Sequence, residues 1–111
     1  MNPKTGVLFL SGPMTGIKDW NHPAFNEAAR RLRALGYRVW NPAEIDNGKT
    51  GKPREYYMRI NFQRLVQDGD DAITSLFQLP GWRFSRGAMD EAHVARALGI
   101  AWHDYAVVSA S

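Results

Sequence analysis

The sequence contains no cysteine, which excludes a disulfide framework and a thiolate metal site. It also lacks any apolar run that approaches the length of a membrane span, and no segment has the pattern of a secretory signal. Its three histidines are not spaced like the ligands of a metal triad. These absences predict a cytoplasmic protein that needs no membrane, no metal and no other cofactor.

Charge of one sign is also scarce, because 14 Lys and Arg residues stand against 11 Asp and Glu residues, for a net charge of +3. Proteins that bind nucleic acid usually carry a denser basic stripe, so we do not expect a nucleic-acid partner. Basic residues do gather at Lys49, Lys52, Arg54 and Arg59. This cluster is either a solvated surface or a means of attracting a small anion such as a phosphate.

The 111 residues suit one domain over residues 1–111, and an apolar fraction of 44% can supply a real core. Short apolar runs at 7–10, 37–40, 72–77 and from 100 onward alternate with helical periods at 23–35, 55–67 and 86–98. This alternation predicts an α/β fold with a parallel sheet. Right-handed crossovers would give a small Rossmann-like (flavodoxin-like) sheet of four to five strands, with helices on both faces.

The first helix should begin after Asn21, which is suited to cap it, and end before Gly36, which is suited to a left-handed position. Its buried stripe is expected to contain five residues, Phe25, Ala28, Ala29, Leu32 and Leu35. Ligands of such sheets bind beyond the carboxyl ends of the strands. In this chain, that edge would be built from residues 11–16, 41–54 and 78–86.

The last helix carries a carboxylate on its apolar face. At 100° per residue, Glu91 falls in the arc that should face the sheet. That arc also holds Ala88, Ala92, Ala95 and Leu98. A buried carboxylate is costly unless it is paired or used in chemistry. Glu91 is therefore either a structural residue with a partner or a functional group, and the start of this helix opens onto the expected ligand edge.

Two polar residues accompany Glu91. Ser85 precedes the helix, where its hydroxyl can cap the first turn and can also share in an anion site with the free N–H groups. Asn61 lies inside the apolar arc of the second helix. It either pairs with the backbone or holds a sugar hydroxyl or a carboxylate.

Three stretches of the chain together resemble one known family. They are Leu8 to Gly16, Phe25 to Glu44, and the LPGW run at 79–82 followed by Ser85-Arg86-Gly87-Ala88 and Glu91. The chain resembles the nucleoside 2-deoxyribosyltransferase-like superfamily over nearly its whole length, and is most similar to a phage and prophage branch of unknown function. Characterised members are deoxyribosyltransferases and 2′-deoxynucleoside 5′-phosphate N-hydrolases that generally work as homodimers or larger homo-oligomers.

This resemblance implies a function and a site. Glu91 would attack C1′ of the sugar of a nucleoside or nucleotide and form a covalent glycosyl-enzyme, as in retaining glycosidases. Asn61 would be the second catalytic residue, and Ser85 with Arg83 or Arg86 would hold a 5′-phosphate. The implied substrate-binding residues are Phe9, Ser11, Gly12, Pro13, Met14, Thr15, Gly16, Trp82, Ser85, Arg86 and Gly87.

The chain departs from the family pattern at three positions. Asn61 stands where the family usually has an Asp, and an amide cannot donate a proton as an acid. Phe9 stands where the hydrolases have a Tyr, and Thr15 where they have an Arg. An acid from the 68–71 segment would be one substitute for Asn61. The alternative function is a nucleotide-binding protein with weak or no turnover, acting as a sensor or in host interaction.

Overall fold

The structure is a computed structural model that describes residues 6–106. Its strands are β1 (Val7–Ser11), β2 (Arg38–Trp40), β3 (Ile73–Gln78) and β4 (Ala101–Asp104). Its α-helices are α1 (His22–Ala34), α2 (Arg54–Val66) and α3 (Arg86–Ala97). Short 3-10 segments are η2 (Lys18–Asn21), η3 (Pro42–Gly48) and η4 (Trp82–Phe84). Each predicted helix and strand is therefore present, with ends displaced by only one or a few residues.

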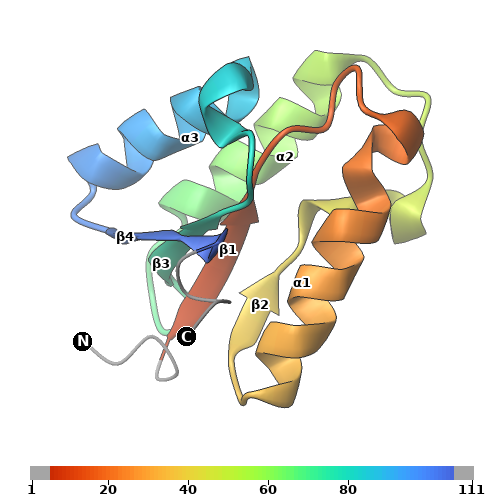
Figure 1. Cartoon of the computed structure of the whole chain (residues 1–111). Helices are drawn as coiled ribbons and strands as arrows, with labels where there is room; N and C mark the ends of the chain where they lie inside the picture. The colour runs from red at the N-terminus through yellow and green to blue at the C-terminus, as the bar shows by residue number, and fades with distance from the viewer. Residues whose placement is uncertain (1–5, 107–111) are drawn as a thin grey trace.

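The four strands form one parallel sheet in the order β2-β1-β3-β4 (Figure 1). This order is that of a flavodoxin-like sheet, and its switch point lies between β1 and β3. Helix α1 packs on one face, and α2 and α3 lie side by side on the other. The predicted α/β fold with helices on both faces is confirmed.

Strand β1 shows how the sheet divides the core in two. Leu8 and Leu10 pack under α1, whereas Val7 and Phe9 pack under α2 and α3, because successive side chains of a strand point to opposite faces. The same alternation sends Ser11, the last residue of the strand, to the side of α2 and α3. The strand is otherwise apolar but ends in a polar side chain, which lies on the same side of the sheet as Glu91.

Two leucines predicted to be buried are exposed instead. Leu35 is 61% exposed and Leu98 is 53% exposed, and each follows the last residue of its helix. The chain leaves helical geometry at these positions, so the 100° rule no longer fixes the direction of the side chain. The remaining predicted stripe of α1 is buried.

The predicted cap at Asn21 is also corrected. Asn21 precedes α1 with a φ of 59°, and its side chain makes no capping bond. Its Nδ2 group instead donates to the backbone oxygen of Pro13 at 2.9 Å, which ties the loop after β1 to the start of α1. Gly36 does adopt a left-handed conformation, with a φ of 97°.

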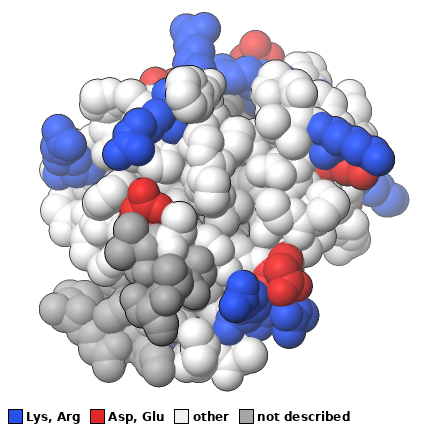
Figure 2. Space-filling view, in the orientation of Figure 1, with Lys and Arg blue, Asp and Glu red and all other residues white. Residues whose placement is uncertain are grey.

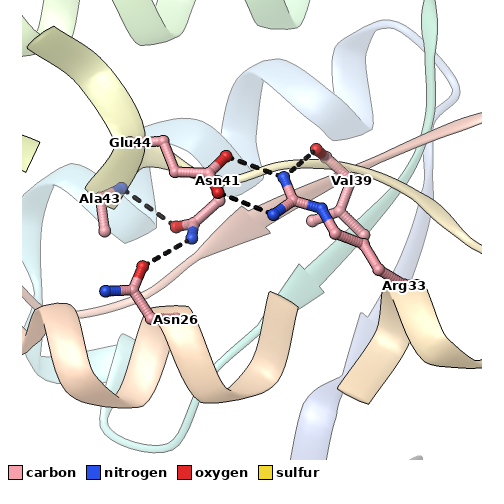
Figure 3. A network of polar contacts seen from close by, with 6 residues as sticks. All are labelled: Asn26, Arg33, Val39, Asn41, Ala43 and Glu44. Atoms are coloured by element: carbon pink, nitrogen blue, oxygen red, sulfur yellow. Dashed lines mark hydrogen bonds and ion pairs between the residues drawn. The ribbon is translucent and has the colours of Figure 1, made fainter. Parts of the chain in front are cut away.

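A polar network holds the loop after β2 against α1 (Figure 3). Asn41 donates to Asn26 and accepts from the backbone N–H of Ala43, both at 3.0 Å. Arg33 of α1 binds both carboxylate oxygens of Glu44. The loop therefore starts from a fixed position, and residues 46–48 complete the η3 segment.

The charged surface is mixed in sign. On the face shown in Figure 2, Lys and Arg side chains form separate groups with uncharged surface between them, and acidic side chains lie beside several of them. This face lacks the continuous basic stripe typical of nucleic-acid binders. Within residues 6–106, none of the helices is long and apolar enough to cross a membrane.

Candidate active site

A pocket of about 190 Å³ opens at the carboxyl end of β1, on the side of the sheet where doubly wound folds bind ligands. Its walls come from the loop after β1, the loop between β2 and α2, and the facing sides of α2 and α3. The lining residues are Ser11, Gly12, Met14, Thr15, Trp20, His22, Phe25, Pro42, Ile45, Lys49, Thr50, Gly51, Lys52, Arg54, Tyr57, Met58, Asn61, Ser85, Gly87, Ala88 and Glu91.

Glu91 lies in the second turn of α3 and is only 5% exposed. Its Oε1 accepts a hydrogen bond of 2.7 Å from Ser11 Oγ. Burial raises the pKa of Glu91 to about 8, although the Ser11 hydrogen bond opposes this rise. Among the described residues that line the pocket, Glu91 is the one carboxylic acid. A group of this kind is typical of a functional site.

Ser11 belongs to a longer chain of hydrogen bonds. Gln78, at the end of β3 and in register with Ser11, donates from Nε2 to Ser11 Oγ at 3.0 Å. The same Nε2 donates to the backbone oxygen of Ala88 at 2.9 Å. Trp102 on β4 donates from its indole to Gln78 Oε1 at 2.7 Å. A polar path therefore crosses the sheet from β4 to Glu91.

Asn61 lines the pocket from α2 and is 4% exposed. Its Oδ1 accepts from the indole N–H of Trp40 at 3.2 Å. Because an indole nitrogen can only donate, this contact assigns the oxygen of the amide to Trp40 and leaves the Nδ2 group for the pocket. Asn61 can therefore donate a hydrogen bond to a ligand, but it supplies no acidic proton.

The start of α3 forms another wall of the pocket. Ser85 caps the helix as predicted, accepting from the backbone N–H of Ala88 at 3.2 Å. A methyl group on Gly87 would lie 3.3 Å from the sulfur of Met58 and 3.7 Å from a guanidinium nitrogen of Arg54. Arg54 is the first residue of α2, so a cation from one helix lies beside the positive end of another.

Three cations line the pocket: Lys49, Lys52 and Arg54. The ion pairs among residues 6–106 use other cations, and they join Arg30 to Glu27, Arg33 to Glu44 and Arg38 to Asp71. Of the two interpretations of this basic cluster, an attraction site for an anion fits its position at the pocket. Arg59, the fourth member of the cluster in the sequence, lies outside the lining.

Several predicted binding residues lie elsewhere. Phe9 is fully buried in the core under α2 and α3, because the strand reaches the pocket only two residues later at Ser11. Trp82 packs against Trp102, with ring centroids 5.8 Å apart. Arg86 is exposed and outside the lining, and Arg83 stacks over Trp82.

Pro13 and Gly16 belong to the loop after β1 but do not line the pocket. Pro13 lies next to Gly81, so close that a side chain added to Gly81 would contact the proline ring. The suggested acids of segment 68–71 come just before β3. They therefore lie toward the amino ends of the strands, opposite the pocket. They are not brought to Glu91.

Sequence reasoning missed two partners of the site, the buried Gln78 and the half-exposed Trp102. A glutamine at the end of the apolar run 73–77 was the available signal, because a buried amide needs partners. It also missed Arg54 as the cation at the start of α3. The family resemblance suggested Arg83 and Arg86 instead, which are close to Ser85 in sequence but lie outside the lining of the pocket.

A family model described as a domain of unknown function, DUF4406, matches residues 6–103. The match begins just before β1 and ends within β4, so it includes every element that forms the pocket. No curated protein matches the chain.

Proposed function

The chain belongs to the family of domains of unknown function DUF4406, and we propose that it is an N-glycosidase or deoxyribosyltransferase. Its substrate would be a 2′-deoxynucleoside or the corresponding 5′-monophosphate. The observation that carries this proposal is Glu91, a buried carboxylic acid held by Ser11 at a pocket on the carboxyl edge of the sheet. The resemblance to the nucleoside 2-deoxyribosyltransferase-like superfamily puts the nucleophile of those enzymes at this same residue.

In the proposed reaction, an ionised oxygen of Glu91 forms a bond to C1′ while the bond from C1′ to the base nitrogen breaks. The base leaves with the bonding electrons and takes a proton from solvent, because Asn61 has none to give. Water then attacks C1′, loses a proton to solvent and releases Glu91 as a carboxylate. In a transferase, a second base would take the place of that water.

The cations of the pocket support a phosphorylated substrate. Arg54 lies beside the first turn of α3, where free N–H groups and the helix dipole favour an anion. Lys49 and Lys52 line the same pocket. We infer that a 5′-phosphate binds among these groups and Ser85, with C1′ directed toward Glu91. The family resemblance also supports a homodimer or larger homo-oligomer.

A second candidate function is a nucleotide-binding protein without turnover. It is favoured by Asn61, which gives the described part of the pocket a single carboxylic acid, and by a Glu91 pKa of about 8, which leaves most of that acid protonated at neutral pH. Binding of a nucleotide would need only the cations of the pocket and the side-chain amide of Asn61. The two functions therefore share the pocket and differ in whether the glycosidic bond breaks.

One experiment separates these functions. The protein is incubated with 2′-deoxynucleosides, their 5′-monophosphates and matched ribonucleotides, and free base is measured by chromatography while the melting temperature is recorded. We expect base release from at least one deoxy substrate, with the monophosphate preferred. A nucleotide that raises the melting temperature without release of base would overturn the enzyme proposal in favour of the binder. Adding a second base tests for transfer.

A further inference from the structure

The hydrogen-bond chain behind Glu91 has a direction that can be derived from its two ends. At one end, the indole of Trp102 can only donate, so the atom of Gln78 that it contacts must be the amide oxygen. The backbone oxygen of Ala88 can only accept, so the atom of Gln78 that it contacts must be the amide nitrogen. The two contacts agree on one orientation of the Gln78 amide. Turning the amide over would break both.

This orientation determines what Ser11 can do. The amide nitrogen of Gln78 points a proton at Ser11 Oγ, so the hydroxyl must accept on that side. A hydroxyl has one proton of its own, and the remaining polar neighbour is Glu91 Oε1 at 2.7 Å. Ser11 and Gln78 are both nearly or fully buried, at 1% and 0% exposed. Bulk water therefore does not compete for these bonds.

We propose that Gln78 is a positioning residue of this site, which Trp102 and Ala88 fix in the one orientation that makes Ser11 donate its proton to Glu91. Its catalytic importance rests on the proposed function, but the contacts themselves do not. The proton from Ser11 holds Oε1 in place. Oε2 of Glu91 has no hydrogen-bond partner among the described residues and is not among their buried unpartnered atoms, so it is the oxygen left to face the pocket.

The donated proton also favours the ionised form of the carboxyl group, which is the form that a nucleophile needs. With a donor fixed at Ser11, a protonated Glu91 gains less from the contact than an ionised one does. The charged groups that act on Glu91 are Asp90 on α3, which raises its pKa, and Arg54 on α2, which lowers it. The neighbours from β1 and β3 are the uncharged Ser11 and Gln78.

The test measures the pKa of Glu91 directly, by NMR of carboxyl-labelled glutamate in the full chain. The sequence has four glutamates, and the Glu91→Gln spectrum identifies the signal. In Gln78→Met, the Ser11 hydroxyl can turn and accept a proton from Glu91, so the protonated form gains a bond. We expect the pKa to rise by about one unit, a tenfold change in the ionisation constant. Gln63→Met, at an exposed glutamine of α2, should leave it unchanged.

A double-mutant comparison shows whether Gln78 acts through Ser11. Ser11→Ala should raise the pKa of Glu91 by a similar amount, and adding Gln78→Met to it should cause no further rise. A merely structural role of Gln78 predicts the same additional shift with or without the Ser11 hydroxyl, and that result would overturn the proposal. So would an unchanged pKa in Gln78→Met.

Trp102→Phe provides a variant outside the buried core, because Trp102 is 47% exposed. It removes one of the two contacts that orient the amide and keeps an aromatic ring. We expect a pKa shift of the same sign but smaller, and a shift of opposite sign would contradict the proposal. None of these measurements needs substrate, so the positioning role and the enzymatic function can fail separately.

Discussion

Glu91→Gln is expected to lower kcat/KM for base release by about 10³-fold or more, with binding of the nucleotide retained. The amide has nearly the same shape as the acid and can still accept the proton of Ser11, but it cannot form the glycosyl ester. Initial rates of base release by chromatography measure the first quantity, and titration of the variant with nucleotide measures the second.

Glu55→Gln is the matched control, since Glu55 is an exposed residue in the first turn of α2 and does not line the pocket. It should retain the activity of the parent protein.

The activity of the parent should rise with pH up to about 8, because only the ionised fraction of Glu91 can attack. Activity that persists in Glu91→Gln, or that falls as pH rises from 6 to 8, would remove Glu91 from the role of nucleophile.

The second large effect concerns stability and needs no substrate. The pKa of Glu91 is about 8 in the folded protein, against the ordinary value of 4.5 that applies to the unfolded chain. Between these values the folded state binds more protons than the unfolded state, so the free energy of unfolding falls as pH rises from about 4.5 to about 8. At about 1.4 kcal/mol per pH unit, the loss is on the order of 5 kcal/mol.

Denaturant unfolding of the parent and of Glu91→Gln at several pH values between 5 and 9 isolates this contribution. Glutamine does not titrate, so the difference between the two proteins cancels most other groups, including His103, whose pKa is lowered by burial. We expect the free energy of unfolding of the variant to increase steadily relative to that of the parent up to about pH 8. Above that pH the difference should stay constant. A difference that does not change with pH would mean that Glu91 titrates at its ordinary value.

The fold follows from local patterns that act independently of one another. Apolar runs and helical periods determine the elements, and the right-handed crossover rule then leaves few topologies. The same helical period singled out Glu91, because α3 is regular from Arg86 to that residue. It failed at Leu35 and Leu98, where the helices have ended and the side chains no longer follow the period.

The rest of the site depends on contacts between distant segments, which spacing does not encode. Gln78 meets Ser11 only through the register of β1 with β3, and its amide is oriented only by a tryptophan on β4. Arg54 comes to the start of α3 because α2 and α3 pack side by side, not because of its place in the sequence. Phe9 shows the reverse case: the family resemblance suggested a pocket residue, but the strand pleat buries it.

The central claim is that Glu91 forms a covalent bond with the sugar. It is tested most directly by mass spectrometry of the protein after reaction with a substrate analogue that carries fluorine at C2′, which slows release of the glycosyl-enzyme. We predict a mass increase equal to the fluorinated sugar or sugar phosphate, found on the peptide that contains Glu91 and absent in Glu91→Gln. An adduct on another residue, or release of base from the analogue with no adduct at any time, would contradict the account.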